Sequence, residues 1–457
     1  EAKDATAAAG TAAAETTESE KEWYGTEDGK TITLHFWGGV QPEYGYDDLC
    51  ANFNEEYKDK GLQVEYVRYV NDDNGNLQLE TYLMGGGDVD LFIGYGGRTK
   101  MDKRVDSNLL LDMSGMLNDI GFNLDDELGV ANMAEYHYDD GAVYGFPTKY
   151  ENSRWILINE DMFKEAGLDI PYDGWTYSEF LADAEKLTHG EDQDKVYGVC
   201  WARKQSGKSI LYALDGVLGA NQIYKNEEGT EVNFDNDVYR AGFNLVKETL
   251  DKGYAIPIED EFSEDISVAN TFLQGKCAIM LGVAQMRLCM DQENYPHDFT
   301  TALVPAPVPD DEKYNTEFYR KQIGTTGAGD LLSISANTKY PEASFEFAMW
   351  YLKGGMSPLV QGGRIPLWNG VNKDEVLSVL KEKAQGSIDM DSMENYLSLD
   401  TTQGVAAIKG HASSEISSAW FEEFDAMCYG KQSVDQTVQN MEKRGNELIQ
   451  TELSSQK

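Results

Sequence analysis

Aromatic residues at predicted strand ends are the side chains whose type and position best match a ligand chemistry. The chain contains 8 Trp and 26 Tyr. Sugars present apolar C–H faces and a rim of hydroxyl groups, so sugar sites combine aromatic rings with carboxylate, amide and guanidinium groups. The alternative place for each ring is the hydrophobic core. We predict that four of them are platforms for a sugar: Trp37, Tyr95, Trp201 and Trp368.

A second candidate is the segment Ala202–Ser209, ARKQSGKS, which approaches the pattern of a phosphate-binding loop. It follows the apolar run Val196–Trp201 and ends in Gly-Lys-Ser. Ala202, however, stands where such a loop needs a glycine for its tight turn, and no strand ending in a metal-binding Asp follows as expected. Nucleotide binding is therefore a distant alternative.

Few other residues have spacings typical of catalysis or of a metal site. The sequence has no HExxH and no GxSxG, and its five His are scattered. The segment Asn71–Asn76 resembles the start of a calcium loop, but Tyr82 occupies the twelfth position, where a Glu is required. The five Cys are odd in number and far apart. We predict no catalytic residue, no metal and no cofactor, although the 80 acidic residues leave a glycosidase pair open.

The length and charge of the chain exclude some classes of partner. A chain of 457 residues is too long for one ordinary core, so we expect two domains. The net charge of −42 would repel nucleic acid and anionic membranes. Because the acidic residues are spread along the chain, we interpret them as a solvated surface. A neutral ligand would hardly feel this field, whereas an anionic ligand would need a local basic pocket.

Strands and helices alternate near the amino terminus. Residues 31–37, TITLHFW, place Ile32, Leu34 and Phe36 on one face of a strand. A β-α-β-α-β order indicates a parallel sheet, whose ligands bind beyond the carboxyl ends of the strands. Two of those ends are Gly-rich, at 37–39 and 94–98. The later predicted elements are a helix over 46–58, a strand over 62–68, a helix over 77–84 and a strand over 89–93.

The stretch from Gly141 to Thr188 orders its motifs in a specific way. Asn159 is placed to cap a short helix, and Thr176 to Glu179 have the spacing of a capping box. The motifs are YGFP (144–147), INEDMF (158–163), KEAGL (164–168), Pro171, Trp175 and KLT (186–188). This order resembles the family 1 extracellular solute-binding proteins, which deliver sugars to ABC importers. The resemblance continues through GKCAIMLG (275–282), TTALVP (300–305), DLLSIS (330–335) and GGRIP (362–366), and so covers about residues 30 to 370.

The resemblance implies an α/β fold of two Rossmann-like lobes, joined by a multi-strand hinge around a ligand cleft, as in the type II periplasmic binding proteins. Such lobes close by a hinge when ligand touches both. We expect the chain to cross between lobes near 147–151, 302–305 and 356–361. The predicted first lobe is 30–148 plus 306–356, the second is 149–305 plus 357–457, and residues 1–29 are a disordered lipoprotein spacer.

The resemblance also implies which residues contact the ligand. Ordinary surface positions are the alternative for the polar ones. At two other positions the chain departs from the family pattern, with Ile158 for Tyr and Glu160 for Lys. The implied contacts are Gln41 and Glu43 after the first strand, Tyr95 and Arg98 after the third, Glu151 and Asn152 at the first crossing, Gln285 after GKCAIML, Arg364 and Trp368 in the late turn, and Trp201 facing the cleft.

The resulting prediction is a binding protein and not an enzyme. It would capture an oligosaccharide reversibly and pass it to the permease subunits of an ABC importer. We expect a monomer with no nucleic-acid partner, held outside the cell membrane of a Gram-positive bacterium by a lipid anchor on a segment removed from this sequence. The alternatives are a carbohydrate-active hydrolase or lyase, and a binding protein for a polyamine or a peptide.

Overall fold

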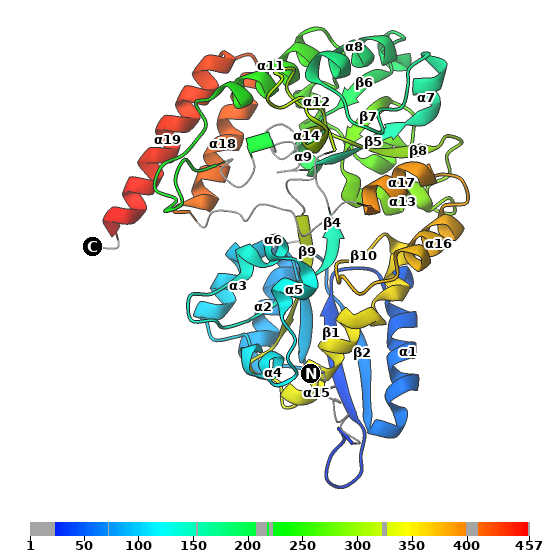
Figure 1. Cartoon of the computed structure of the whole chain (residues 1–457), viewed down its shortest axis with the longest axis vertical. Coiled ribbons are helices and arrows are strands. Elements are labelled where there is room, and N and C mark those ends of the chain that lie inside the picture. Colours follow the sequence, from blue (N-terminus) through cyan, green and yellow to red (C-terminus); the bar gives the residue numbers. More distant parts are fainter. Residues whose placement is uncertain are drawn as a thin grey trace, which may run out of the picture.

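The chain folds into two α/β lobes, one above the other in Figure 1. The structure is a computed structural model, and it describes residues 23–71, 73–151, 154–206, 217–218, 223–321, 327–398 and 410–455. In this part of the chain, no helix is both long enough and apolar enough to cross a membrane.

The first lobe is built on a six-stranded sheet. Its parallel strands pair in the register Ile32 with Leu62 and Phe36 with Leu91, which confirms the predicted β-α-β-α-β order. Three strands from later in the sequence complete the sheet, each paired antiparallel with its neighbour. The strand order is β10 (Ile365–Pro366), β4 (Phe146–Glu151), β9 (Gly327–Ile334), β3 (Leu91–Gly94), β1 (Ile32–Gly38) and β2 (Leu62–Arg68).

Helices cover both faces of this sheet. On one face the ring of Phe36 lies 5.1 Å from Phe347, centroid to centroid. On the other face the ring of Trp37 lies 4.9 Å from Tyr82. Alternation along β1 therefore buries two successive aromatic rings in two different layers. The helices are α1 (Tyr46–Tyr57) and α15 (Pro341–Trp350) on the Phe36 side, and α2 (Asp73–Gly85) and α3 (Gly97–Asp106) on the other.

The second lobe has a four-stranded sheet in the order β6 (Tyr197–Cys200), β7 (Cys277–Leu281), β5 (Trp155–Asn159) and β8 (Thr301–Pro305). Both predicted caps are confirmed, since Asn159 accepts from the Met162 N–H and Thr176 forms a capping box with Glu179. The main helices are α7 (Glu160–Glu165), α8 (Tyr177–Leu187), α11 (Asp237–Asp251), α12 (Ile258–Ser263), α17 (Met390–Leu397), α18 (Ser413–Cys428) and α19 (Val434–Ser455).

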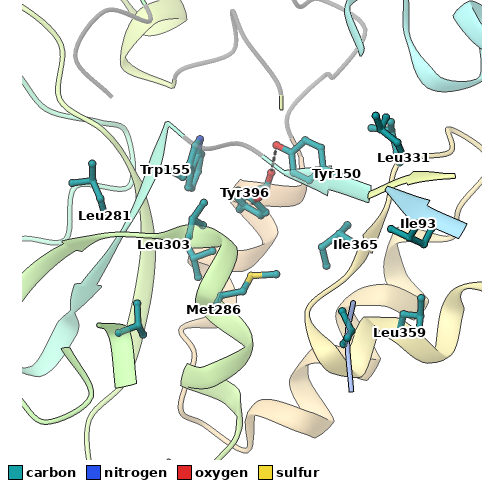
Figure 2. Packing of buried hydrophobic residues seen from close by; sticks show 14 of the residues in the cluster. Ile93, Tyr150, Trp155, Leu281, Met286, Leu303, Leu331, Leu359, Ile365 and Tyr396 are labelled. Carbon is teal, nitrogen blue, oxygen red and sulfur yellow. Dashed lines mark hydrogen bonds between the residues drawn. The ribbon is translucent and has the colours of Figure 1, made fainter. Parts of the chain in front are cut away.

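A continuous set of buried side chains joins the lobes. The Tyr150 hydroxyl at the end of β4 donates to the Tyr396 carbonyl of α17 at 3.2 Å, and the Tyr396 ring lies 5.3 Å from Trp155 of β5. Figure 2 shows Tyr396 between these two residues, with Leu303 and Met286 below it and Ile365 and Leu359 beyond. One core therefore spans the hinge.

The chain passes between the lobes after β4, after β8 and after β10. The first passage lies where it was predicted. The last follows Pro366 and not 356–361, because η9 (Ser357–Gly362) packs on the first lobe, with the Pro358 carbonyl against Gly45. The predicted passage near 302–305 is also wrong, because β8 pairs with β5 inside the second-lobe sheet and the Arg320 guanidinium still donates to the Gly174 carbonyl of that lobe. The division into domains stays a prediction. In the structure, residues 306–320 lie with the second lobe and residues 357–366 lie with the first.

Candidate functional site

Two tyrosines shape the loop that follows β1. The Tyr95 hydroxyl accepts from the Gly39 N–H at 3.0 Å, and the Tyr66 hydroxyl donates to the Val40 carbonyl at 2.8 Å. The contact is so close that a Cβ at Gly39 would lie 2.7 Å from the Tyr95 ring. A glycine is therefore needed at position 39, and the tyrosines hold the loop in one path.

The same loop leads Gln41 and Glu43 to the surface, where both are exposed. It then turns through η1 (Pro42–Tyr44), and Gly45 ends the turn with φ of 105°, a left-handed conformation that favours glycine. The Tyr44 hydroxyl donates to Asp291 Oδ2 of the second lobe at 3.3 Å. Burial and the charge of Asp291 raise the pKa of Tyr44. The loop after β1 therefore contacts the other lobe.

The facing segment of the second lobe follows β7. Gly282, with φ of 128°, turns the chain into η7 (Val283–Gln285) and α13 (Met286–Met290). Gln285 is half-buried here, and Asp291 at the end of α13 is only 3% exposed. Both Asp291 oxygens accept from the Asn294 side chain, at 3.1 and 2.9 Å. Polar groups of both lobes therefore meet between the β1 loop and α13.

A buried charge cluster lies behind this meeting point. Asp330 Oδ2 accepts from Arg364 Nε at 2.8 Å, and Asp330 Oδ1 lies 3.8 Å from Lys149 Nζ. Burial alone would raise the pKa of Asp330, but Lys149, Arg364 and then Arg287 outweigh it and hold this pKa below its usual value. Burial alone would lower the pKa of Arg364, but the charge of Asp330 raises this pKa overall. Asp330 is therefore ionised, and it holds Arg364 in a structural role.

Arg287 of α13 lies at the edge of this cluster. A Cβ built at Gly363 of the first lobe would be 3.1 Å from the Arg287 Cβ, so the two lobes are in close contact there. Burial, followed by repulsion from Arg364, lowers the pKa of Arg287. Arg287 is not among the contacts predicted from the sequence. Its position two residues after Gln285, in the segment that follows GKCAIML, is the signal that would have found it.

Three predicted ligand contacts are wrong, because the structure uses their side chains internally. Trp37 is 4% exposed and its indole donates to the Asp88 carbonyl at 2.8 Å. Trp201 is 1% exposed and donates to Thr249 Oγ1 at 2.9 Å. Arg98 pairs with Asp102 at 2.6 Å, also donates to two carbonyls, and stacks on Tyr138. These three residues belong to the lobe cores.

The other predicted contacts differ in how far their side chains are exposed. Tyr95 is half-buried beneath the β1 loop, and Arg364 is buried in the charge cluster. The Trp368 indole donates to Glu127 Oε2 at 2.7 Å, and its ring is half-buried. Glu151 ends β4, but its side chain is outside the description, as are Asn152 and residues 207–209 of the phosphate-loop candidate. Gln41, Glu43, Tyr95, Gln285 and Trp368 thus remain the predicted contacts with some exposed surface.

Exposure of the β1 loop leads to a binding prediction. The double change Gln41→Ala and Glu43→Gln removes polar groups that carry no packing, so the free energy of unfolding is expected to change by less than about 0.5 kcal/mol. Affinity for the ligand should fall about 10-fold, the value of roughly one hydrogen bond. Isothermal titration calorimetry measures it, with the exposed helix residue Glu55→Gln as control. An unchanged affinity would remove the loop from the site.

Comparisons with known proteins match the fold described above. A model of the bacterial extracellular solute-binding protein family matches residues 38–353. The fold is similar to that of an ABC substrate-binding protein from Listeria monocytogenes in complex with cycloalternan (TM-score 0.68, 17% identity, 92% of this chain and 100% of that chain). It is also similar to a cyclic α-maltosyl-1,6-maltose binding protein from Arthrobacter globiformis (0.65, 15%, 92% and 100%).

A third similar structure is the sugar-binding protein MalE from Xanthomonas citri, with a TM-score of 0.64, 16% identity, and coverage of 93% of this chain and 99% of that chain. Similarity over nearly the whole of each chain confirms the predicted fold, that of the type II periplasmic binding proteins.

Proposed function

This chain belongs to the bacterial extracellular solute-binding protein family, and we propose that it captures an oligosaccharide between its lobes and delivers it to an ABC importer. The observation that carries the proposal is the meeting of polar loops from both lobes, linked by the Tyr44–Asp291 hydrogen bond. The sugar ligands named for the structurally similar proteins from Listeria and Arthrobacter support it.

The proposed capture uses groups of different chemistry from each lobe. The amide of Gln41 and the carboxylate of Glu43 would bind sugar hydroxyls from the first lobe, and Gln285 from the second. The rings of Tyr95 and Trp368 would lie against the apolar faces of the sugar. Glu151 and Asn152 stay in the proposal as contacts at the first crossing. A ligand that touches both lobes favours the closed arrangement by its extra affinity for it.

The family is one of binding proteins, and we propose that no bond of the ligand is broken. The enzyme alternative requires a pair of carboxylates placed about 5–10 Å apart across a glycosidic bond. It predicts cleaved products after incubation with glycans. The polyamine alternative requires an acidic site, whereas the buried cluster at the lobe contact contains Lys149, Arg287 and Arg364.

The family functions outside the cytoplasm, and the finer location is part of the proposal. We propose a monomer tethered by a lipid anchor to the outer face of a Gram-positive cell membrane, with residues 1–29 as spacer. The closed form would dock on the permease subunits of the importer.

A thermal-shift screen tests the proposed function. The panel contains α- and β-linked oligosaccharides, monosaccharides, polyamines and peptides. A ligand at 100 times its Kd stabilises the folded state by about 2.7 kcal/mol, which raises Tm visibly. We expect a hit among the oligosaccharides, recovered intact by mass spectrometry. Recovery of cleaved glycan would favour the enzyme, and a shift with polyamines or peptides alone would overturn the sugar.

A further inference from the structure

Arg287 is a half-buried cation with no ion pair and no hydrogen bond to the described part of the chain. It lies on α13, against Gly363 of the first lobe. Its electrostatic neighbours are Tyr44, Tyr295, Arg364 and Asp330. A guanidinium group removed from water without a partner carries a free-energy cost that a binding partner would relieve.

The two described carboxylates near Arg287 are already used by other groups. Asp330 is already shared between Arg364, at 2.8 Å, and Lys149, at 3.8 Å. Asp291, the other buried carboxylate nearby, accepts from Tyr44 and from Asn294. Both carboxylates therefore already have other partners among the described residues. In a chain with a net charge of −42, a half-buried Arg287 without a carboxylate of its own among these residues is a local basic site of the kind an anionic ligand needs.

The position of Arg287 is also suited to contact with a ligand. It follows Gln285 by two residues in the segment after β7, and Tyr44 of the β1 loop is among its neighbours. Its guanidinium keeps its positive charge at neutral pH and presents a planar fork of N–H donors, which fits the two oxygens of a carboxylate or the oxygens of a sulfate. A neutral hydroxyl would satisfy an N–H but would leave the charge uncompensated.

We propose that the saccharide bound between the lobes carries an anionic group, the carboxylate of a uronic acid or a sulfate ester, and that Arg287 binds it. The inference rests on the proposed function and names the chemical class of its ligand. Gln41, Glu43 and Gln285 then bind the neutral hydroxyls of the same molecule. A uronic acid carboxylate and a sulfate ester would bind the Arg287 guanidinium in the same way, and the experiment below distinguishes the two.

Matched saccharides that differ only in charge test the inference. The first probes are galacturonic and glucuronic acid oligosaccharides, each paired with its methyl ester. The second are sulfated disaccharides, each paired with the unsulfated form. We expect the charged member of one pair to bind about 30-fold more tightly or better, with an affinity that falls as NaCl rises. Titration calorimetry measures both.

Variants of Arg287 assign the effect to this residue. Arg287→Gln should abolish the preference for the charged form, and Arg287→Lys should keep part of it, because it retains the charge without the fork. Arg444→Gln is the matched control, since Arg444 pairs with Glu422 and Glu423 on α18. If Arg287→Gln fails to fold, as judged by circular dichroism, Arg287→Lys and the salt dependence decide.

Each result has a definite meaning. Preference for a uronate or for a sulfate that is lost in Arg287→Gln supports the inference and identifies the source of the charge. Equal affinity for charged and neutral members overturns it while the proposed function stands. Binding of neutral oligosaccharides alone also overturns the inference and leaves the proposed function standing. Binding of no saccharide at all overturns the proposed function as well.

Discussion

Asp330→Asn is expected to lower the free energy of unfolding by about 3–5 kcal/mol, because it removes a carboxylate from a buried cluster of cations. Arg364 would lose its ion pair at 2.8 Å, and Lys149 its neighbour at 3.8 Å. Asn keeps the size of the side chain and tolerates the φ of 55° found at this position. The change in the free energy of unfolding therefore comes from the lost negative charge and not from a change in side-chain shape.

Urea unfolding at pH 7, followed by tryptophan fluorescence, measures this effect. Asp237→Asn is the matched control, because the Asp237 side chain is fully exposed and lies 3.8 Å from Arg240. The control should change the free energy of unfolding by less than about 0.5 kcal/mol. If Asp330→Asn is as harmless as the control, the buried cluster does not have the structural role that we assign to it.

Glu261 is expected to make the stability of the second lobe depend on pH. This residue of α12 is 1% exposed, and its Oε2 has no hydrogen-bond partner among the described atoms. Burial raises the pKa of Glu261 to about 7, although the N–H groups of Arg203, Lys204 and Ala202 partly oppose the shift. The folded state therefore holds the proton more tightly than the unfolded state does. The stabilisation is fully present below pH 4.5 and is lost as the pH rises to about 7.

The loss amounts to about 3 kcal/mol over this range, at 1.36 kcal/mol for each unit of pKa shift. Glu261→Gln cannot ionise, so the stability difference between pH 5 and pH 8 should be about 2.5 kcal/mol smaller than in the parent chain. Urea unfolding at the two pH values measures it. Glu259→Gln, an exposed position on the same helix, should leave the pH dependence unchanged. Parallel curves for the parent and Glu261→Gln would contradict the prediction.

Much of the fold could be predicted because its signals are local. The alternation of TITLHFW predicted β1, and the spacing of Asn159 and of Thr176 to Glu179 predicted the caps that the structure contains. The order of motifs between Gly141 and Thr188 indicated the family. Such signals depend on residues that are neighbours in the chain, so they are visible without tertiary structure.

The site was predicted less well, because its geometry depends on layers and on distant segments. Trp37 and Trp201 were correctly placed near strand ends, but covering helices decide whether a strand-end ring faces ligand or core. For Arg98, the spacing to Asp102 was a local sign of an ion pair that the prediction did not use. The meeting of Arg287 with Gly363 joins segments from two lobes, and no local pattern predicts it.

Small-angle X-ray scattering of the protein, with and without the oligosaccharide found by thermal shift, tests the central claim most directly. Capture between two hinged lobes predicts a smaller radius of gyration with saturating ligand, while the saccharide remains intact in the same sample. A bound saccharide that leaves the radius of gyration unchanged, or that is recovered as cleaved products, would contradict capture by closure of the two lobes.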